Sequence, residues 1–221
     1  MPGPLRQPTT MKQIALFGGS GKTGRQFLQQ ALDKGYRIKA LVRNPATLSI
    51  SHPALEVIKG DVLRLDDVDK TVAGTDVVVS LFGHVKDSPA NLQTEGTQNI
   101  VTAMKRHGVQ RIISLSGGGL PYEKDQPKFA DKLIRGIMQL VAKKILDDAI
   151  NHAAVLQQSG LQWTIVRGPR LTDAPGTGRY NVGWVGVPGG TQISRTDLAQ
   201  FIVSLLESDE FIGEMPFVTK V

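Results

Sequence analysis

Two periodicities of hydrophobic and polar residues alternate along this chain. Short apolar runs have the length and composition of strands, at residues 14–17, 37–43, 55–59, 76–82, 111–115 and 161–167. Between them, apolar residues recur at helical spacing over residues 22–34, 66–73, 91–107, 128–159 and 196–207. Regular alternation of strand and helix predicts a parallel sheet with helices on both faces, joined by right-handed crossovers.

The C-terminal part of the chain is less regular. A glycine-rich tract at residues 176–190 predicts a small strand or hairpin, and residues 215–219 predict a closing edge strand. An apolar stripe at residues 134–141 predicts core packing, with an acceptor lid or a partner face as alternatives. Residues 1–10 are rich in Pro and Gly and predict a disordered leader or a cloning remnant. We therefore expect one α/β domain over residues 11–221, a doubly wound parallel sheet with a small C-terminal elaboration on the substrate side.

Composition narrows the class of protein. The chain has 221 residues, 40% of them hydrophobic, and no apolar run near the roughly 20 residues that cross a bilayer. Without cysteine there is no disulfide, thiolate metal site or cysteine nucleophile. The net charge is +6, but the basic residues are scattered and aromatics make up only 5%. We expect a cytoplasmic protein with no nucleic-acid, membrane or metal partner.

The first strand runs directly into a glycine-rich turn that opens a helix, at Gly18, Gly19, Ser20, Gly21, Lys22, Thr23 and Gly24. Such a turn brings free backbone N–H groups and the helix dipole to a phosphate. A nucleotide triphosphatase loop is the alternative, but Leu16 stands where that motif requires glycine. The spacing of Gly19, Gly21 and Gly24 instead matches the dinucleotide fingerprint of the Rossmann fold, and Lys22 would help to neutralise the pyrophosphate.

Residues after the next strands predict which dinucleotide binds. Arg43 ends the second strand, where an acidic residue would accept the ribose hydroxyl of NAD, and arginine suits the 2′-phosphate of NADPH. The alternative is a solvated strand end. Asp61 and Val62 are placed for the adenine, although Asp61 also suits a helix cap. The ribose would pass over Leu81, Phe82 and Gly83, and Phe82 suits the core equally well.

The far end of the predicted sheet supplies candidates for the nicotinamide and the acceptor. Ser114 or Ser116 could hydrogen-bond either group, or be ordinary strand-end serines, and Gly168 and Pro169 would close over the nicotinamide. The candidates for binding the acceptor are Arg167, Arg170, Trp184 and His84.

Acid–base residues of the usual short-chain dehydrogenase are missing. No Tyr-x-x-x-Lys pair occurs, and among the histidines His107 and His152 fit surface positions of helices. Reduction of an isolated carbonyl requires a placed acid, whereas hydride added to a conjugated ring system spreads charge over that system and leaves protonation to water. The missing pair therefore favours a conjugated acceptor.

Several segments together form a familiar pattern: residues 17–24, 41–43, 60–62, 67–74 and 95–100, continued by 103–109 and 159–161. This pattern resembles the atypical short-chain dehydrogenase/reductases, of NmrA-like type, and within them the flavin reductase or biliverdin-IX-beta reductase group. This resemblance implies an NADPH-dependent reductase, often monomeric, with a flavin or linear tetrapyrrole as substrate rather than prosthetic group. The chain departs from the pattern at Gly117, where the group has serine, at Arg170, where it has histidine, and at Thr47, where it has a second basic residue.

Two other functions stay open at this level. The missing Tyr-Lys pair equally suits a regulatory protein that senses NADP(H) and binds a partner without turnover. An NADP-linked reductase or isomerase of another small metabolite is the third alternative.

Overall fold

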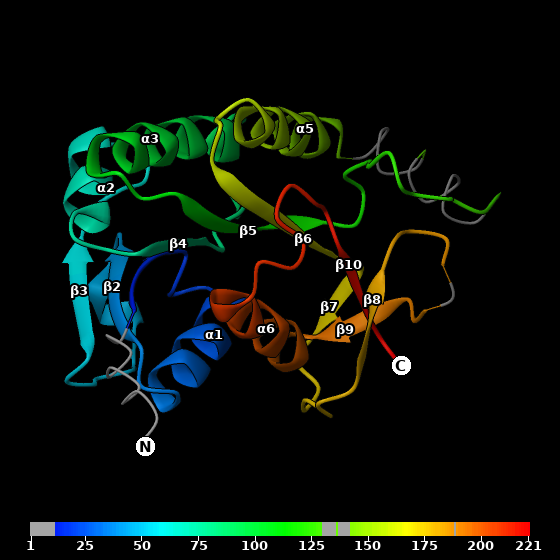
Figure 1. Ribbon diagram of the computed structural model, residues 1–221, viewed down its shortest axis with the longest axis horizontal. Coiled ribbons are helices and arrows are strands. Elements are labelled where there is room, and N and C mark those ends of the chain that lie inside the picture. Colours follow the sequence, from blue (N-terminus) through cyan, green and yellow to red (C-terminus); the bar gives the residue numbers. More distant parts are fainter. Residues whose placement is uncertain (1–11, 130–135, 137–141, 188) are drawn as a thin grey trace, which may run out of the picture.

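The computed structural model describes residues 12–129, 136, 142–187 and 189–221. One eight-stranded sheet runs through the molecule in the order β3-β2-β1-β4-β5-β6-β10-β8 (Figure 1). Its strands are β1 (Gln13–Phe17), β2 (Arg37–Val42), β3 (Leu55–Lys59), β4 (Val77–Ser80), β5 (Arg111–Gly117), β6 (Gln162–Gly168), β8 (Tyr180–Gly183) and β10 (Phe217–Lys220). All neighbouring strands pair in parallel except β8, which is antiparallel to β10. The predicted doubly wound α/β fold is confirmed.

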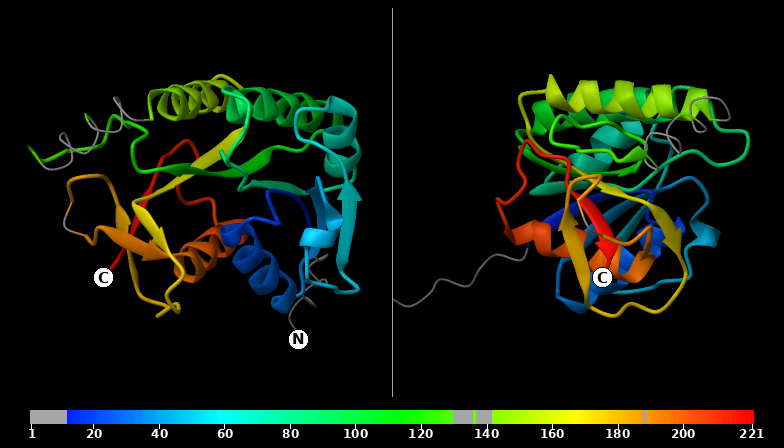
Figure 2. Two further views of the ribbon diagram at one scale, coloured as in Figure 1. Left: turned by 180° about the vertical axis from the view of Figure 1, so that it is seen from behind. Right: turned by 90° about the vertical axis from the view of Figure 1, so that its right-hand side faces the viewer.

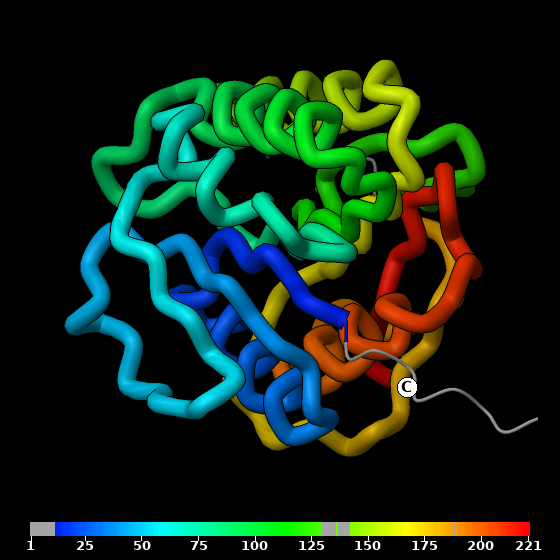
Figure 3. The backbone as a smooth tube through the Cα atoms, turned by 60° about the vertical axis from the view of Figure 1, so that its left-hand side comes forward, coloured from blue at the N-terminus to red at the C-terminus, as the bar shows by residue number. Residues whose placement is uncertain are grey.

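Helices cover both faces of the sheet (Figures 1 and 2). One face carries α1 (Lys22–Asp33) and α6 (Arg195–Ser204), and the other carries α2 (Leu65–Val72), α3 (Leu92–His107) and α5 (Lys143–Gln157). The tube in Figure 3 shows α3 and α5 side by side above the strands. Of the helices within the described ranges, none is both long and apolar enough to cross a membrane.

The central strands separate two hydrophobic cores. Ile14 and Leu16 of β1 face α1 and α6, whereas Ala15 and Phe17 face α2, α3 and α5. All four are buried because β1 has sheet neighbours on both sides and helices on both faces. Helix α1 buries the predicted stripe of Phe27, Leu28, Ala31 and Leu32. The order of the strands reverses between β1 and β4, so the fold creates its crevice at the carboxyl ends of these two strands.

The glycine-rich tract contains the predicted small strand, β8, but the predicted closing strand, β10, is not at the edge of the sheet. Residues 217–220 form an inner strand, because β8 from the glycine-rich tract pairs along its outer side. Pro216 precedes this strand, so its missing N–H removes no bond from the ladder. A second sheet joins β7 (Arg170–Thr172) to β9 (Gln192–Ser194), and both strands are too short to show a periodicity in the sequence.

The described residues also contain two short 3-10 helices, η1 (Pro45–Thr47) after β2 and η2 (Leu205–Glu207) after α6. The predicted leader at residues 1–10 and the apolar stripe at 134–141, whose apolar positions are 134, 137, 138, 140 and 141, lie outside the described residues. The predicted long helix over 128–159 is confirmed for its second half as α5.

Candidate cofactor and acceptor site

The glycine turn after β1 leaves no room for larger residues at two positions. A Cβ atom on Gly18 would lie 2.4 Å from the backbone nitrogen of Phe82, and Gly18 has a φ of +85°. A Cβ atom on Gly24 would lie 2.1 Å from the carbonyl oxygen of Gly18. These glycines therefore hold three chain segments in contact: the turn, the first turn of α1 and the end of β4.

The turn leads into the N-terminus of α1, where Gly21 and Lys22 are exposed. Gly21 is the N-cap residue of α1 and provides no side-chain cap, and the first turn of the helix contains no acidic residue. Its leading N–H groups and its partial positive charge are therefore available to an anion. Lys22, exposed at the first helical position, adds a full positive charge. This arrangement can bind a pyrophosphate.

Two arginines lie at the loop after β2, one in the loop and one on α1. Arg43 is exposed directly after the strand, and the loop that follows turns through η1, where the Asn44 side chain accepts a hydrogen bond from Ala46 N. Arg25 of α1 donates to the carbonyl oxygen of Thr47, at 2.8 Å. Sequence reasoning missed Arg25, although it is the first residue after the glycine fingerprint. The structure brings this second guanidinium to the loop where the resemblance had suggested a missing basic residue.

Apolar side chains that follow β3 and β4 lie beside the turn. The ring of Phe82 and the side chain of Val62 both pack where a Cβ on Gly96 of α3 would lie, 2.8 Å from Phe82 Cζ and 3.0 Å from Val62 Cγ2. Phe82 is half-buried and belongs to the core on this face, as the alternative interpretation predicted. Leu81 is buried, and its N–H donates to Phe17 O at 2.8 Å.

Asp61 closes a turn rather than capping a helix. Its Oδ1 accepts a hydrogen bond from Leu63 N at 3.0 Å, whereas α2 has Arg64 at its N-cap position. Asp61 N in turn donates to Asp67 Oδ2. The half-buried Asp61 therefore has a fixed backbone beside Val62, at the place expected for an adenine.

The two serines of β5 have different surroundings. Ser114 is buried, and its hydroxyl shares a hydrogen bond of 2.9 Å with His152 Nε2 on α5. It therefore points into the interior, so its predicted contact with nicotinamide or acceptor is wrong. Ser116 is nearer the carboxyl end of the strand, and its buried Oγ has no hydrogen-bond partner among the described residues. An unpaired buried hydroxyl at this edge suits a ligand contact.

Comparison with known proteins shows the family to which the chain belongs. Residues 18–209 match the model of a family described as NAD(P)H-binding.

This chain belongs to the NAD(P)H-binding family. An uncharacterized chloroplastic protein of Arabidopsis thaliana is 27% identical over 225 residues, which cover 94% of this chain and 76% of that protein. A 3-beta-hydroxysteroid dehydrogenase of Mycolicibacterium neoaurum is 29% identical over 117 residues, which cover 48% of this chain and only 32% of the dehydrogenase. A short-chain dehydrogenase/reductase of Veillonella parvula, solved in complex with NADP, shares the fold with a TM-score of 0.75 at 19% identity, covering 95% of this chain and 94% of that one.

Within this family fold, Arg167 is not available to an acceptor. The residue is fully buried, and its guanidinium forms two hydrogen bonds of 2.8 Å with Asp125. Further bonds reach the carbonyl oxygens of Leu120 and Met215. The predicted acceptor role of Arg167 is therefore wrong, because every nitrogen of the side chain already has a partner inside the protein.

His84 is likewise engaged inside the protein. Its Nε2 lies 2.7 Å from Asp148 Oδ2, and its side chain is only 10% exposed. Burial raises the pKa of Asp148, but hydrogen bonds from Thr94, from Gln93 N and from His84 outweigh it and lower that pKa overall. The predicted role of His84 in acceptor binding is therefore replaced by a structural one, since it ties the loop after β4 to α5.

His152 overturns a second expectation. It is 1% exposed rather than on the surface, and burial lowers its pKa to about 4. At neutral pH the imidazole is therefore uncharged and holds Ser114. The helical pattern around residue 152 did not reveal this, because histidine is compatible with either face of a helix.

Arg170 and Trp184, both predicted to bind the acceptor, differ in the exposure of their side chains. Arg170 is exposed at the first position of β7, directly after Gly168 and Pro169 at the end of β6. Trp184 is half-buried, with its ring 5.4 Å from the Tyr122 ring and the Lys124 ammonium 5.1 Å from its centroid. Arg170 is thus the predicted acceptor residue whose side chain is most accessible.

Gly83 offers a test of where the cofactor passes. A Cβ built on this glycine meets no heavy atom within 4 Å, and its φ is not positive. We expect Gly83→Ala to leave the melting temperature unchanged and to raise the Kd for NADPH roughly three- to tenfold, because the added methyl group would occupy space intended for the ribose. Calorimetric titration together with a thermal melt checks both effects. An unchanged Kd would place the cofactor away from Gly83.

Proposed function

We propose that this NAD(P)H-binding chain is an NADPH-dependent reductase that delivers hydride to a conjugated ring system, such as a flavin or biliverdin. The observation that carries the proposal is the position of its tyrosines, because a carbonyl reductase of the usual kind requires a tyrosine beside the nicotinamide as acid. The chain has three tyrosines, and all lie in described segments.

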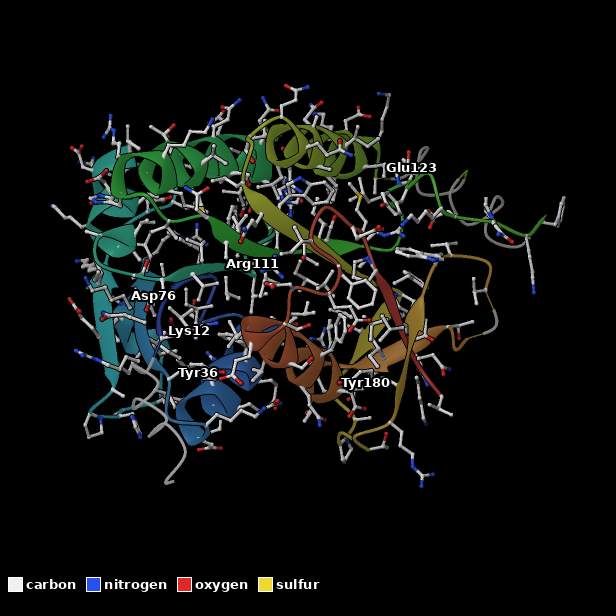
Figure 4. All side chains as sticks on the ribbon, viewed as in Figure 1. Lys12, Tyr36, Asp76, Arg111, Glu123 and Tyr180 are labelled. Carbon is white, nitrogen blue, oxygen red and sulfur yellow. The ribbon has the colours of Figure 1, made fainter. Side chains whose placement is uncertain are left out.

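Each tyrosine is engaged by other residues of the protein. Tyr36 donates to Glu207 at 2.7 Å on the side of α1 and α6 (Figure 4), and Tyr122 donates to Glu214 at 2.6 Å. Burial and these carboxylates raise the pKa of both phenols. Tyr180 packs edge-on against Phe201, and burial raises its pKa as well. None of the three is therefore suited to donate a proton to a substrate.

A delocalised acceptor removes the need for such an acid. Charge from the arriving hydride spreads over the ring system, and water can supply the proton afterwards. The protein would then contribute mainly by binding and orienting two rings, which can itself lower a barrier by several kcal/mol. Arg170 is available for a phosphate or propionate of the acceptor.

Preference for NADPH is proposed from the loop after β2. Arg43 and Arg25 offer guanidinium groups for a 2′-phosphate, and no acidic residue follows β2 directly to accept a ribose hydroxyl. The uncapped N-terminus of α1 would hold the pyrophosphate, and Ser116 would offer its hydroxyl near the nicotinamide. NADPH, when bound, supplies the hydride.

An absorbance assay tests the proposal. Purified protein is mixed with NADPH and, in separate reactions, with FMN, FAD, riboflavin or biliverdin, and the nicotinamide absorbance is followed. We expect oxidation with at least one acceptor, and a higher KM in the variant Arg170→Gln. Arg179→Gln, at an exposed arginine directly before β8, is the matched control. Cofactor binding without oxidation of NADPH by any acceptor would contradict turnover and favour the sensor alternative.

A further inference from the structure

Two cations and one carboxylate meet beside the glycine turn. Lys22 Nζ lies 2.7 Å from Asp173 Oδ2, and Arg195 Nη1 lies 2.6 Å from Asp173 Oδ1. They come from three separate elements: Lys22 begins α1, Asp173 follows β7, and Arg195 begins α6. The side chain of Arg195 is 20% exposed, whereas those of Lys22 and Asp173 are 71% and 62% exposed.

The loop that carries Asp173 is fastened to α6. Asp197 Oδ1 accepts hydrogen bonds from the backbone nitrogens of Thr177 and Gly178, at 2.8 and 2.9 Å. A Cβ on Gly176 would lie 2.7 Å from a methyl carbon of Thr196, so the loop packs closely on the start of this helix. The loop of Asp173 and the start of α6, which carries Arg195, are therefore held together by several contacts.

Helix α1 also contacts the start of α6. The Gln30 side chain donates to Thr196 O at 3.0 Å, and Gln26 lies 3.2 Å from the Thr196 hydroxyl. Lys22 is the most exposed member of the group and sits on a flexible four-carbon stem. An ion pair this exposed is weak and exchanges readily. Lys22 is therefore the member of the group that can change partners.

The charges have a direct consequence for an anion at α1. Lys22 and Arg195 with one carboxylate carry a net charge of +1 next to a helix N-terminus without a cap. A pyrophosphate arriving there would attract both cations and be repelled by Asp173. Lys22 can bind the incoming anion only after its ammonium separates from the Asp173 carboxylate.

We propose that Asp173 is an internal counter-ion that the cofactor pyrophosphate displaces, and that Arg195 of α6 is a second cationic ligand of that pyrophosphate beside Lys22. Asp173 is then a positioning residue that acts through the two cations. It keeps Lys22 and Arg195 close to the pyrophosphate site, and its own negative charge weakens binding of the anion. The inference rests on the proposed function for the identity of the anion, since it deepens the description of the same site.

Charge-neutralising variants test the inference with two probes, NADPH and inorganic pyrophosphate. Calorimetric titration at low salt should give a Kd for Asp173→Asn that is roughly three- to tenfold lower than for wild type, and a Kd for Arg195→Gln that is higher by a similar factor. The double variant should lie near wild type, because the lost anion and the lost cation offset each other. Asp33→Asn, at the far end of α1, is the matched control and should change nothing.

Salt dependence separates this role from a structural one. Removing Asp173 raises the local charge, so the Kd of Asp173→Asn should rise more steeply with salt than that of wild type. Pyrophosphate binding that tightens in Asp173→Asn supports the inference even if wild type fails to bind NADPH, a failure that would overturn the proposed function alone. The inference is overturned if Asp173→Asn, with an unchanged melting temperature, binds both probes as wild type does or more weakly. If the Asp173 variant does not fold, Arg195→Gln decides: an unchanged Kd for pyrophosphate overturns the role of Arg195.

Discussion

Replacing Arg43 with aspartate should remove the preference for NADPH over NADH. The exposed arginine follows β2 directly, where a guanidinium can form charge-assisted hydrogen bonds with a 2′-phosphate. Bonds of this class contribute about 1.5–3 kcal/mol, so we expect the Kd for NADPH to rise roughly 10- to 100-fold. The Kd for NADH should stay unchanged or fall, because a carboxylate at this position can accept the ribose hydroxyl. Calorimetric titration with both cofactors measures the ratio.

Arg37→Asp is the matched control for this change. Arg37 is exposed at the opposite end of the same strand, so its replacement alters net charge equally without touching the loop after β2. Arg25→Gln should shift the ratio in the same direction as Arg43→Asp by a smaller factor, since Arg25 also donates to Thr47 O. If Arg43→Asp and Arg37→Asp give the same ratio of Kd values, Arg43 does not select the cofactor.

Asp125→Ala should destabilise the folded protein strongly. The Asp125 carboxylate forms a bidentate pair with the fully buried Arg167 and also accepts hydrogen bonds from Tyr122 N and Val185 N. Removing it leaves a guanidinium in the interior without its counter-charge, which typically costs about 3–5 kcal/mol. At about 2–4 °C per kcal/mol for a domain of this size, the melting temperature should fall by roughly 10 °C. Urea unfolding and a thermal melt measure the two quantities.

An exposed ion pair provides the comparison. Lys143 and Asp147 form a pair on α5 with side chains 72% and 50% exposed, and Asp147→Ala should cost less than about 1 kcal/mol. The double variant Asp125→Leu with Arg167→Met should recover part of the loss, because it removes both buried charges together. Equal destabilisation by Asp125→Ala and Asp147→Ala would show that the buried pair has no special role in stability.

Arg167 also illustrates which features the sequence could not reveal. It ends an apolar strand, and the same pattern is compatible with a solvent-facing ligand contact. Its partner Asp125 stands 42 residues earlier, in a segment without periodicity. Ser114 and His152 are similar, since only the packing of α5 on β5 brings them together. Pairings over such separations depend on tertiary structure, which no local pattern encodes.

Features contained in one strand–turn–helix unit were predictable. The glycine turn, the start of α1 and the position of Arg43 at the end of β2 follow from spacing and residue type within about 30 residues. Arg25 lies in the same unit, but its bond to Thr47 depends on how the loop folds back onto α1. The small sheet of β7 and β9 was missed because three residues are too few to show the alternation of apolar and polar residues that predicts a strand.

The most direct test is a titration of the wild-type protein with NADPH and with NADH under identical conditions. Binding at the glycine turn with a 2′-phosphate held by Arg43 predicts one cofactor per chain and a Kd for NADPH at least about tenfold below that for NADH. Equal affinities, or no binding of NADPH, would contradict this account of the site.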